Sequence, residues 1–463
     1  MLNLPKRGKM ENKDIYQQKA IHTNGNILLI ASAGSGKTTT IIQKIDYLIS
    51  QNLYKEKEIL VISFTNKSVQ DLKNRIKYHI DILTFHKLAI NILKYYQINY
   101  KIAPSDYLEY ITKEFFYSLT NIKYIKEILL FYKEHNYNKF LCSNKFTHLI
   151  KIITTYIKLY KTNNKNIEDI KKSFRVNKFY TKYIFIILNI YNNELNSSNL
   201  YDFDDLITIS TKKLNSFYKY KYIMVDEFQD TSLIRWNLLY KLLQLNKATL
   251  FAVGDDFQSI YNFSGCSINL FLNIKNYIPN ISILKLENNY RNSEELNNIA
   301  TSFILKNKKQ KDKKIHCFKH LKNPIKIIYY FNDKIALYFL LKYLKNRYSK
   351  ILILGRNNFD INPYSNIIKK YNNIEYLTIH KSKGLENDVV IIINLTNNLY
   401  GFPNKIINED IINNLHPNDS SYLYAEERRL FYVALTRTKN EVYLLTPFFN
   451  KSIFIKEIKH FRK

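Results

Sequence analysis

A glycine-containing loop between a short apolar run and a helical pattern most constrains how this sequence folds. Residues 26–30, NILLI, are predicted to form a buried strand, and they lead into ASAGSGKTTTIIQKIDYLI. A strand, a loop of small residues ending in Gly-Lys-Thr and a helix form a P-loop, whose backbone N–H groups hold phosphates. Lys37 is expected to reach the terminal phosphates and Thr38 to ligate Mg²⁺. The first glycine of the pattern is replaced by Ala31.

A P-loop that hydrolyses a nucleotide also needs carboxylates, and one segment supplies two of them. In KYIMVDEFQDTS the apolar run YIMV reads as a strand that ends directly at Asp226 and Glu227. Asp226 is then the carboxylate on the metal side, and Glu227 is the expected general base for the attacking water. Taken alone, the pair could be an exposed acidic turn after a strand. Together with the P-loop it indicates an ATPase.

With the P-loop and Asp226-Glu227-Phe228-Gln229-Asp230-Thr231 in view, the chain resembles the UvrD/Rep family of superfamily 1 helicases. The motifs of that family follow one another in order along nearly the whole sequence. Besides the P-loop and the acidic segment they are YQQKAI (16–21), SFTNKSVQDLKNRI (63–76), LTFHKLA (83–89), YDFDDLI (201–207), VGDDFQSIYNFSG (253–265), LENNYRNSEEL (286–296), YLTIHKSKGLEND (376–388) and EERRLFYVALTRTK (426–439).

The resemblance implies ATP and Mg²⁺ as cofactors and assigns residues to them. Gln17 would read the adenine, Tyr290 would stack on it, and Gln258 would sense the γ-phosphate. Arg291 and Arg437 match two arginine fingers, which stabilise charge on the transferred phosphoryl group. The implied catalytic residues are Lys37, Asp226, Glu227, Gln258, Arg291 and Arg437, with Thr38 and Asp226 on the metal. The implied ATP-binding residues are Gln17, Ala31, Ser32, Ala33, Gly34, Ser35, Gly36, Lys37, Thr38, Thr39, Tyr290, Gly384 and Glu386.

The resemblance also implies contacts to single-stranded DNA. Aromatic side chains that follow strands are usually core residues, and only the motif match favours a role at the DNA here. An aromatic residue on a loop stacks on a base of any identity, as a motor that moves along a strand requires. The implied DNA-binding residues are Phe64, Thr65, Asn66, Thr84, His86, Tyr261, Phe263 and His380.

Apolar strand runs alternate with helical patterns, which predicts an α/β fold with parallel sheets. By resemblance we expect two RecA-like P-loop NTPase lobes. Lobe 1A would comprise residues 1–87 and 200–285, interrupted by a helical subdomain 1B at 88–199, and lobe 2A would comprise 286–463.

The sequence departs from the family in several places. UvrD and Rep carry a large 2B insertion, which grips duplex DNA and restrains unwinding by the monomer, where only the short stretch from Asn358 to Thr378 stands here. We therefore expect a compact form without 2B. Thr39 replaces a common arginine near the adenine. Phe263 and Ser264 replace a usual Trp-Arg, and the resulting Phe-Ser-Gly is similar to helicase IV.

The chain carries a formal net charge of +31, which favours a polyanionic partner such as nucleic acid. The same bias follows from drift in an AT-rich genome, since Lys, Asn, Ile and Tyr are abundant. No apolar run is long enough for a membrane span, and the N-terminus lacks a secretory signal, so a cytoplasmic protein is expected. Single-stranded and duplex DNA are the expected partners of a monomer or weak oligomer, and an accessory protein stays open.

Three functions remain to be compared. The first is an ATP-dependent helicase or translocase with 3′→5′ polarity in DNA repair or replication. The second is a non-hydrolysing DNA-binding scaffold derived from such an enzyme, which predicts the loss of a catalytic residue. None of the six catalytic positions is lost. The third, a P-loop regulator unrelated to DNA, is disfavoured because the DNA-facing motifs are as complete as the ATP-facing ones.

Overall fold

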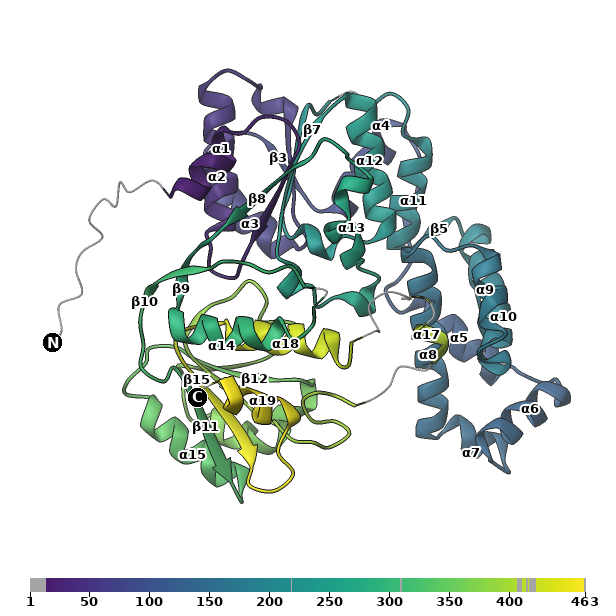
Figure 1. Cartoon of the computed structure of the whole chain (residues 1–463). Helices are drawn as coiled ribbons and strands as arrows, with labels where there is room; N and C mark the ends of the chain where they lie inside the picture. Colours follow the sequence, from purple (N-terminus) through teal and green to yellow (C-terminus); the bar gives the residue numbers. More distant parts are fainter. Residues whose placement is uncertain are drawn as a thin grey trace.

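The computed structural model describes residues 14–461, except residues 218, 309, 406–409, 414 and 416–421. Within this part of the chain, two larger parallel sheets carry helices on both faces, and a helical cluster stands beside them (Figure 1). The predicted mixed α/β fold with parallel sheets is confirmed. The first thirteen residues of the expected 1–87 segment lie outside the described residues.

The first sheet has six parallel strands, and most neighbouring strands along it are far apart in sequence. Its order is β3 (Asp81–Leu83), β2 (Ile59–Ile62), β6 (Tyr222–Val225), β7 (Thr249–Gly254), β1 (Ile27–Ala31) and β8 (Ser282–Leu286). Only the neighbours β3 and β2, and β6 and β7, are consecutive strands of the described chain. Since the strands are parallel, the loops that follow them gather at one edge of the sheet, which is where ligands bind in open α/β folds.

Helices cover both faces of this sheet because its strands are apolar on both sides. In β1, Leu28 and Ile30 join one core cluster while Ile27 and Leu29 join the other. The first cluster includes side chains of α4 (Phe85–Tyr95), α11 (Phe203–Lys213), α12 (Leu233–Asn246) and α13 (Ile268–Leu272). The second includes side chains of α1 (Ile15–His22), α2 (Lys37–Ser50) and α3 (Asn66–Arg75).

A separate helical cluster is inserted between the two short strands β4 (Lys101–Ile102) and β5 (Leu200–Tyr201), which pair with each other at its neck. Its helices share a core of their own and are α5 (Tyr107–Tyr117), α6 (Ile122–Tyr132), α7 (Tyr137–Leu141), α8 (Asn144–Thr162), α9 (Ile167–Ser173) and α10 (Lys178–Ser197). Figure 1 shows them beside the two sheets.

The core of this cluster begins later than the expected boundary at residue 88. Helix α4 packs Leu88, Ala89 and Ile92 into the core of the first sheet, and the helical core starts at Ala103. The core also takes in a distant segment, since Ile411 and Ile412 of α17 (Asp410–Asn413) belong to it. A hydrophobic pattern places residues on a buried face but does not say which core buries them.

The second sheet has five parallel strands in the order β11 (Ile325–Tyr330), β15 (Thr438–Pro447), β14 (Asn387–Ile392), β12 (Ile351–Gly355) and β13 (Ile374–Thr378). One face packs against α14 (Glu294–Ile304), α18 (Ala425–Leu435) and α19 (Ile453–Phe461), and the other against α15 (Asp333–Leu344). A short 3₁₀ helix, η6 (Asn358–Tyr364), and α16 (Ser365–Ile368) join β12 to β13.

The two sheets are joined by a strand pair and by a shared core. Strand β9 (Asn288–Ser293) follows β8 directly and pairs with β10 (His316–Lys319). Phe257 and Ile260, which follow β7, are buried among residues of the second sheet and its helices. No helix among the described residues is both long and apolar enough to span a bilayer.

Candidate functional site

The P-loop lies at the carboxyl edge of the first sheet, where β1 passes into α2. Gly36 precedes the first residue of α2 in the left-handed region, at φ 85°. A Cβ atom there would lie 2.5 Å from Nε2 of Gln17, and one on Gly34, at φ +81°, would lie 2.6 Å from Cβ of Arg291. Both glycines are therefore required by backbone conformation and by close neighbours. A loop that leads through such glycines into a helix N-terminus is suited to holding a phosphate on its backbone N–H groups.

Glu227 stands opposite the P-loop lysine after strand β6. Oε1 of Glu227 lies 3.0 Å from Nζ of Lys37, and Oε2 lies 3.6 Å from Nζ of Lys383. Burial opposes ionisation of this carboxyl, but the two lysines outweigh burial and hold its pKa below its usual range. Glu227 also has a left-handed backbone, at φ 50° and ψ 42°, which costs an ordinary residue about 1–2 kcal/mol. Such strain is concentrated at functional sites.

Asp226 has a different environment from its neighbour. It is 7% exposed, and its Oδ1 accepts a hydrogen bond from the backbone N–H of Glu227 at 2.9 Å. Burial and the charge of Glu227 raise the pKa of Asp226 to about 6. A carboxylate with this surplus of negative charge beside a phosphate cradle fits a divalent cation, because carboxylate and hydroxyl oxygens are the ligands Mg²⁺ prefers. The donor set of Asp226 and Thr38 therefore fits Mg²⁺.

The two expected arginine fingers come from the part of the chain after β8 and meet at the same cavity. Nη2 of Arg437 donates to Oε1 of Gln258 at 3.0 Å, and Nε of Arg291 lies 2.9 Å from Oε2 of Glu386. Burial and the nearby charge of Arg291 lower the pKa of Arg437 to about 9. The buried Arg437 and the partly exposed Arg291 repel each other, and an anion between them relieves that repulsion.

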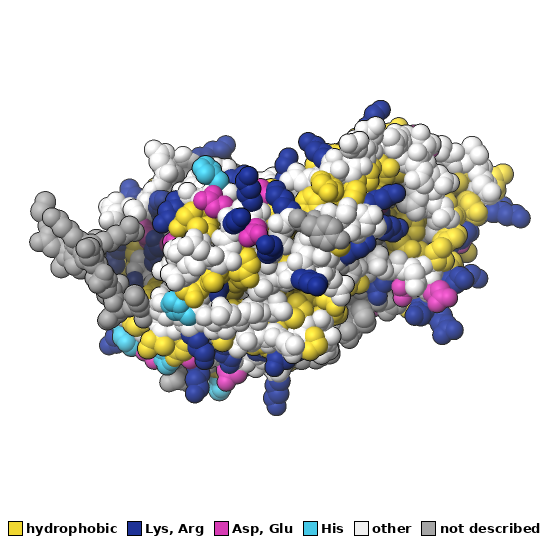
Figure 2. Space-filling view, turned by 90° about the horizontal axis from the view of Figure 1, so that it is seen from above, with side chains coloured by type: hydrophobic (Ala, Val, Ile, Leu, Met, Phe, Trp, Pro, Cys, Tyr) yellow, Lys and Arg dark blue, Asp and Glu magenta, His cyan; other side chains and the backbone are white. Residues whose placement is uncertain are grey.

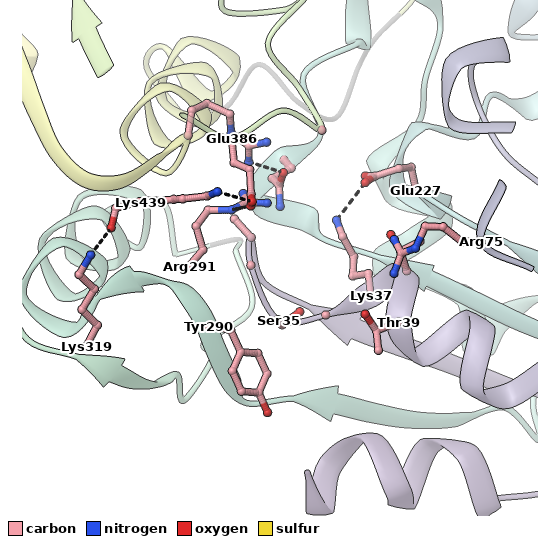
Figure 3. A pocket seen from close by; sticks show the side chains of 17 residues that line it. Ser35, Lys37, Thr39, Arg75, Glu227, Tyr290, Arg291, Lys319, Glu386 and Lys439 are labelled. Atoms are coloured by element: carbon pink, nitrogen blue, oxygen red, sulfur yellow. Dashed lines mark hydrogen bonds and ion pairs between the residues drawn. The ribbon is translucent and has the colours of Figure 1, made fainter. Parts of the chain in front are cut away.

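These side chains enclose a cavity of about 910 Å³ (Figure 3). Among the predicted residues, those on its wall are Ala33, Gly34, Ser35, Gly36, Lys37, Thr38, Thr39, Glu227, Gln258, Tyr290, Arg291, Gly384, Glu386 and Arg437. The other predicted nucleotide and metal residues, Gln17, Ala31, Ser32 and Asp226, are buried and do not line it. The cavity is large enough for a nucleotide and is lined from both sheets.

Tyr290 lines the cavity at the expected adenine end, and Gln17 lies buried behind the P-loop. Nε2 of Gln17 donates to the backbone carbonyl of Ser35 at 3.3 Å, which ties α1 to the P-loop. Tyr290 is half-exposed, donates its hydroxyl hydrogen to Asp14 at 2.7 Å and stacks on Phe318 with ring centroids 5.3 Å apart. The stacked pair offers a flat apolar wall of the kind an adenine ring requires.

Three basic residues on the cavity wall were missed by sequence reasoning. They are Arg75 at the end of α3, Lys319 on β10 and Lys439 on β15 (Figure 3). Lys439 lies 3.1 Å from Glu386, so Glu386 is shared between Lys439 and Arg291. Arg75 and Lys439 lie inside two of the family motifs given above. In a chain with 70 Lys and Arg residues, however, one basic residue does not by itself indicate a binding site.

Three of the predicted DNA-binding aromatics form one cluster across the two sheets. The ring of Phe263 is 5.3 Å from that of His380, and the ring of Tyr261 is 6.0 Å from that of Phe263. The Tyr261 hydroxyl donates to the backbone carbonyl of His380 at 3.0 Å. Phe263 is 54% exposed, so its ring is available to a base. We call Tyr261, Phe263 and His380 the aromatic cluster.

The remaining predicted DNA residues follow β2 and β3 on the first sheet. Phe64 is half-buried, while Thr65 and Asn66 are exposed at the start of α3. Thr84 caps α4 by accepting from the backbone N–H of Lys87, and the ring of His86 contacts that of Phe203 at 5.2 Å. Burial and the charge of Arg235 lower the pKa of His86 to about 4. His86 is therefore neutral at neutral pH.

One segment connects the cavity to the aromatic cluster. Residues 255–265 follow β7 and carry Gln258, which meets Arg437, and also Tyr261 and Phe263. Lys383 reinforces the link, because its Nζ donates to the backbone carbonyl of Gln258 at 2.8 Å and pairs with Asp230. A displacement of Gln258 at the cavity would therefore be transmitted through a short stretch of chain to the aromatic cluster.

The chain matches two domain families in the same order as its sheets. Residues 13–279 match the UvrD/REP helicase N-terminal domain, and residues 362–447 match the UvrD-like helicase C-terminal domain. These two matches include the aromatic cluster and the cavity residues of both sheets except Tyr290, Arg291 and Lys319, and together they span most of the sequence.

Similar proteins carry names from the same group. The ATP-dependent DNA helicase Rep of Buchnera aphidicola subsp. Schizaphis graminum is 33% identical over 333 residues, covering 69% of this chain and 48% of that protein. Rep of Buchnera aphidicola subsp. Baizongia pistaciae is 30% identical over 425 residues, covering 83% and 58%. DNA helicase IV of Escherichia coli is 28% identical over 487 residues, covering 94% and 68%. The chain spans about half the length of the two Rep relatives, and it belongs to the UvrD/Rep helicase family.

Proposed function

We propose that this chain is an ATP-dependent DNA helicase or translocase that moves 3′→5′ along single-stranded DNA. One observation carries the proposal. Arg437 and the P-loop line the same cavity, and Arg437 is hydrogen-bonded to Gln258, whose segment ends in the aromatic cluster. Chemistry in the cavity is thereby connected to a surface suited to stacking on bases. The names of the relatives, Rep and DNA helicase IV, support the same reading.

The proposed chemistry follows from the positions of the side chains. The P-loop and Lys37 hold the phosphates of ATP, and Glu227 accepts a proton from the attacking water. Thr38 and Asp226 would hold Mg²⁺, which supplies positive charge to the phosphate oxygens when bound. Arg291 and Arg437 stabilise the charge that develops on the transferred phosphoryl group. Because they reach the cavity from the second half of the chain, hydrolysis is linked to closure of the two lobes over the bound nucleotide.

We further propose the expected domain organisation, adjusted to the cores of the structure. The first sheet and its helices would be lobe 1A, the helical cluster subdomain 1B, and the second sheet with its helices lobe 2A. Helix α4 is assigned to 1A because its side chains pack in that core.

The decisive experiment is an ATPase assay with and without single-stranded DNA, followed by strand displacement on duplexes with a 3′ or a 5′ tail. The proposal expects hydrolysis stimulated by single strands and displacement that requires the 3′ tail. Binding of DNA without hydrolysis would instead establish the scaffold function. Displacement that required the 5′ tail would reverse the proposed polarity.

The basic surface leads to a prediction about salt. Lys and Arg side chains are spread over the face seen in Figure 2, among few Asp and Glu. Binding of single strands should weaken steeply with salt through counterion release. The logarithm of the binding constant should fall against the logarithm of the salt concentration with a slope of about −0.7 for each phosphate neutralised. Affinity should depend little on base sequence. Fluorescence anisotropy over a salt series measures the slope, and a flat dependence would favour genomic drift as the source of the charge.

The short connection between β12 and β13 leads to a prediction about unwinding. Residues 358–368 form only η6 and α16, with Tyr364 buried and its hydroxyl hydrogen-bonded to Asp333 at 2.6 Å. We propose that subdomain 2B, which in relatives grips the duplex, is absent. Translocation should persist, because the cavity and the aromatic cluster lie outside this connection, while unwinding by the monomer should be weak.

The test compares translocation along single strands with displacement of a paired strand, both at protein concentrations where the chain is monomeric. Rapid translocation with little displacement is the expected result. Processive unwinding by the monomer would show that another part of the chain, such as the helical cluster, supplies the duplex grip.

A further inference from the structure

Arg235 lies inside the predicted DNA surface but belongs to none of the residues assigned to it above. It is the third residue of α12, the helix that follows the Asp226–Thr231 segment. Its guanidinium carbon lies 4.6 Å from the centroid of the Phe64 ring. The cation is therefore held on the face of an aromatic residue that is expected to meet a base.

One nitrogen of the guanidinium group lacks an acceptor within the described part of the chain. The Nη1 atom is buried and makes no hydrogen bond there. Asp204 is close enough for its carboxyl to be affected by the charge of Arg235, but Asp204 accepts a hydrogen bond from Oγ1 of Thr162 at 2.6 Å. A buried donor without a partner costs about 1–3 kcal/mol, and more when it is charged. A ligand acceptor would remove that cost.

The surroundings of Arg235 are also electrostatically unfavourable to a lone cation. It occupies the first turn of α12, where the helix dipole is positive and favours anions. Just before this helix, the hydroxyl oxygens of Thr231 and Ser232 are buried and have no hydrogen-bond partner among the residues that the structure describes, and Ser232 does not cap the helix with its side chain. Three unpartnered polar groups thus stand at one helix start. Together with the positive dipole they favour an anionic ligand.

The position of this turn connects the two groups of predicted DNA residues. On one side Arg235 contacts Phe64, and its charge acts on His86. On the other side Ser232 forms an isolated β-bridge with Cys266, which directly follows the loop that carries Tyr261 and Phe263. A single strand of DNA that runs from Phe64 to the aromatic cluster would therefore pass the start of α12.

We propose that Arg235 binds a backbone phosphate of single-stranded DNA next to the base at Phe64. This inference rests on the proposed function, since it presupposes a single strand on this surface. Arginine suits the task because its planar fork offers several donors to phosphate oxygens and also stacks on an aromatic ring. The contact to Phe64 orients the side chain before the strand arrives, so less rotamer freedom is lost on binding.

The experiment measures binding of a fluorescent oligo(dT) to the wild-type chain and to the variants R235Q, R235K and R347Q over a salt series. R347Q is the matched control, because Arg347 also lies over an aromatic ring, that of Tyr343 at 3.9 Å, but near the end of α15. R235Q should weaken binding about tenfold and reduce the logarithmic salt slope by about 0.7, the share of one phosphate. R235K keeps one charge but loses the planar fork, so it should keep the wild-type salt slope and lose less affinity than R235Q. R347Q should behave as the wild type.

An abasic strand of the same length separates phosphate contact from stacking. It keeps the phosphates and loses the bases, so R235Q should weaken its binding by a similar factor. Thermal unfolding of each variant checks that the fold is retained.

The outcomes distinguish this inference from the proposed function. If the wild-type chain bound no oligo(dT), the proposed function itself would be contradicted. Tight wild-type binding with an unchanged affinity and salt slope in R235Q would overturn the assignment of Arg235. Equal loss in R235K and R235Q, accompanied by a lower unfolding temperature, would show that Arg235 only supports the packing of Phe64, and would overturn it as well.

Discussion

Replacing Glu227 by Gln should abolish DNA-stimulated ATP hydrolysis while ATP still binds. The change removes the proton acceptor but keeps the size of the side chain, and general-base catalysis contributes about 10²–10⁴ in rate. Glu227 has the features of a base that is kept ionised. It is paired with Lys37 at 3.0 Å and lies near Lys383 at 3.6 Å, and these lysines hold its pKa below the usual range. Steady-state turnover at saturating ATP and single-stranded DNA is the measurement.

The matched control for this prediction is Glu375→Gln, at an exposed position on β13 away from the cavity. That variant should turn over as the wild type does. Lys37→Ala should also abolish turnover, but through the loss of phosphate binding, so nucleotide affinity separates the two cases. If Glu227→Gln kept near-normal turnover, another group would have to be the base.

Arg291→Ala and Arg437→Ala should each lower the rate of hydrolysis far more than they lower ATP affinity. A finger acts on charge that develops during phosphoryl transfer, so its loss appears in kcat rather than in ground-state binding. The expected loss is about 10³–10⁵-fold for a finger in its working position. The effect at Arg437 should include a second component, since Arg437 also holds Oε1 of Gln258 at 3.0 Å. Removing it should weaken stimulation by DNA.

Rate at saturating ATP, affinity for a non-hydrolysable ATP analogue and the ratio of rates with and without DNA together test this assignment. Arg347→Ala is the control, because it removes an exposed cation that does not line the cavity. A wild-type rate at saturating ATP in either variant would exclude that arginine as a finger. Gln258→Ala should lower DNA stimulation as Arg437→Ala does if the contact between them transmits the signal.

Much of the nucleotide site could be predicted because its signals are local. The strand before the P-loop, the glycines and the lysine stand within a dozen residues, and the Asp226-Glu227 pair directly follows its strand. Parallel strands bring such loop residues to one sheet edge whatever the length of the connections between them. For this reason Lys37 and Glu227, which are far apart in sequence, were expected to meet, and in the structure they form an ion pair.

Other features were decided by which surfaces meet in three dimensions. The pattern of α4 is that of any amphipathic helix, and only the packing of Leu88 and Ile92 assigns it to the first sheet. The burial of Ile411 and Ile412 in the helical core brings together segments that are far apart in sequence. The basic residues on the cavity wall and Arg235, whose Nη1 has no acceptor among the described residues, could not be found for a similar reason. In a chain this rich in Lys and Arg the identity of a cation carries no information, and only its neighbours, Phe64 for Arg235 and Glu386 for Lys439, show what it does.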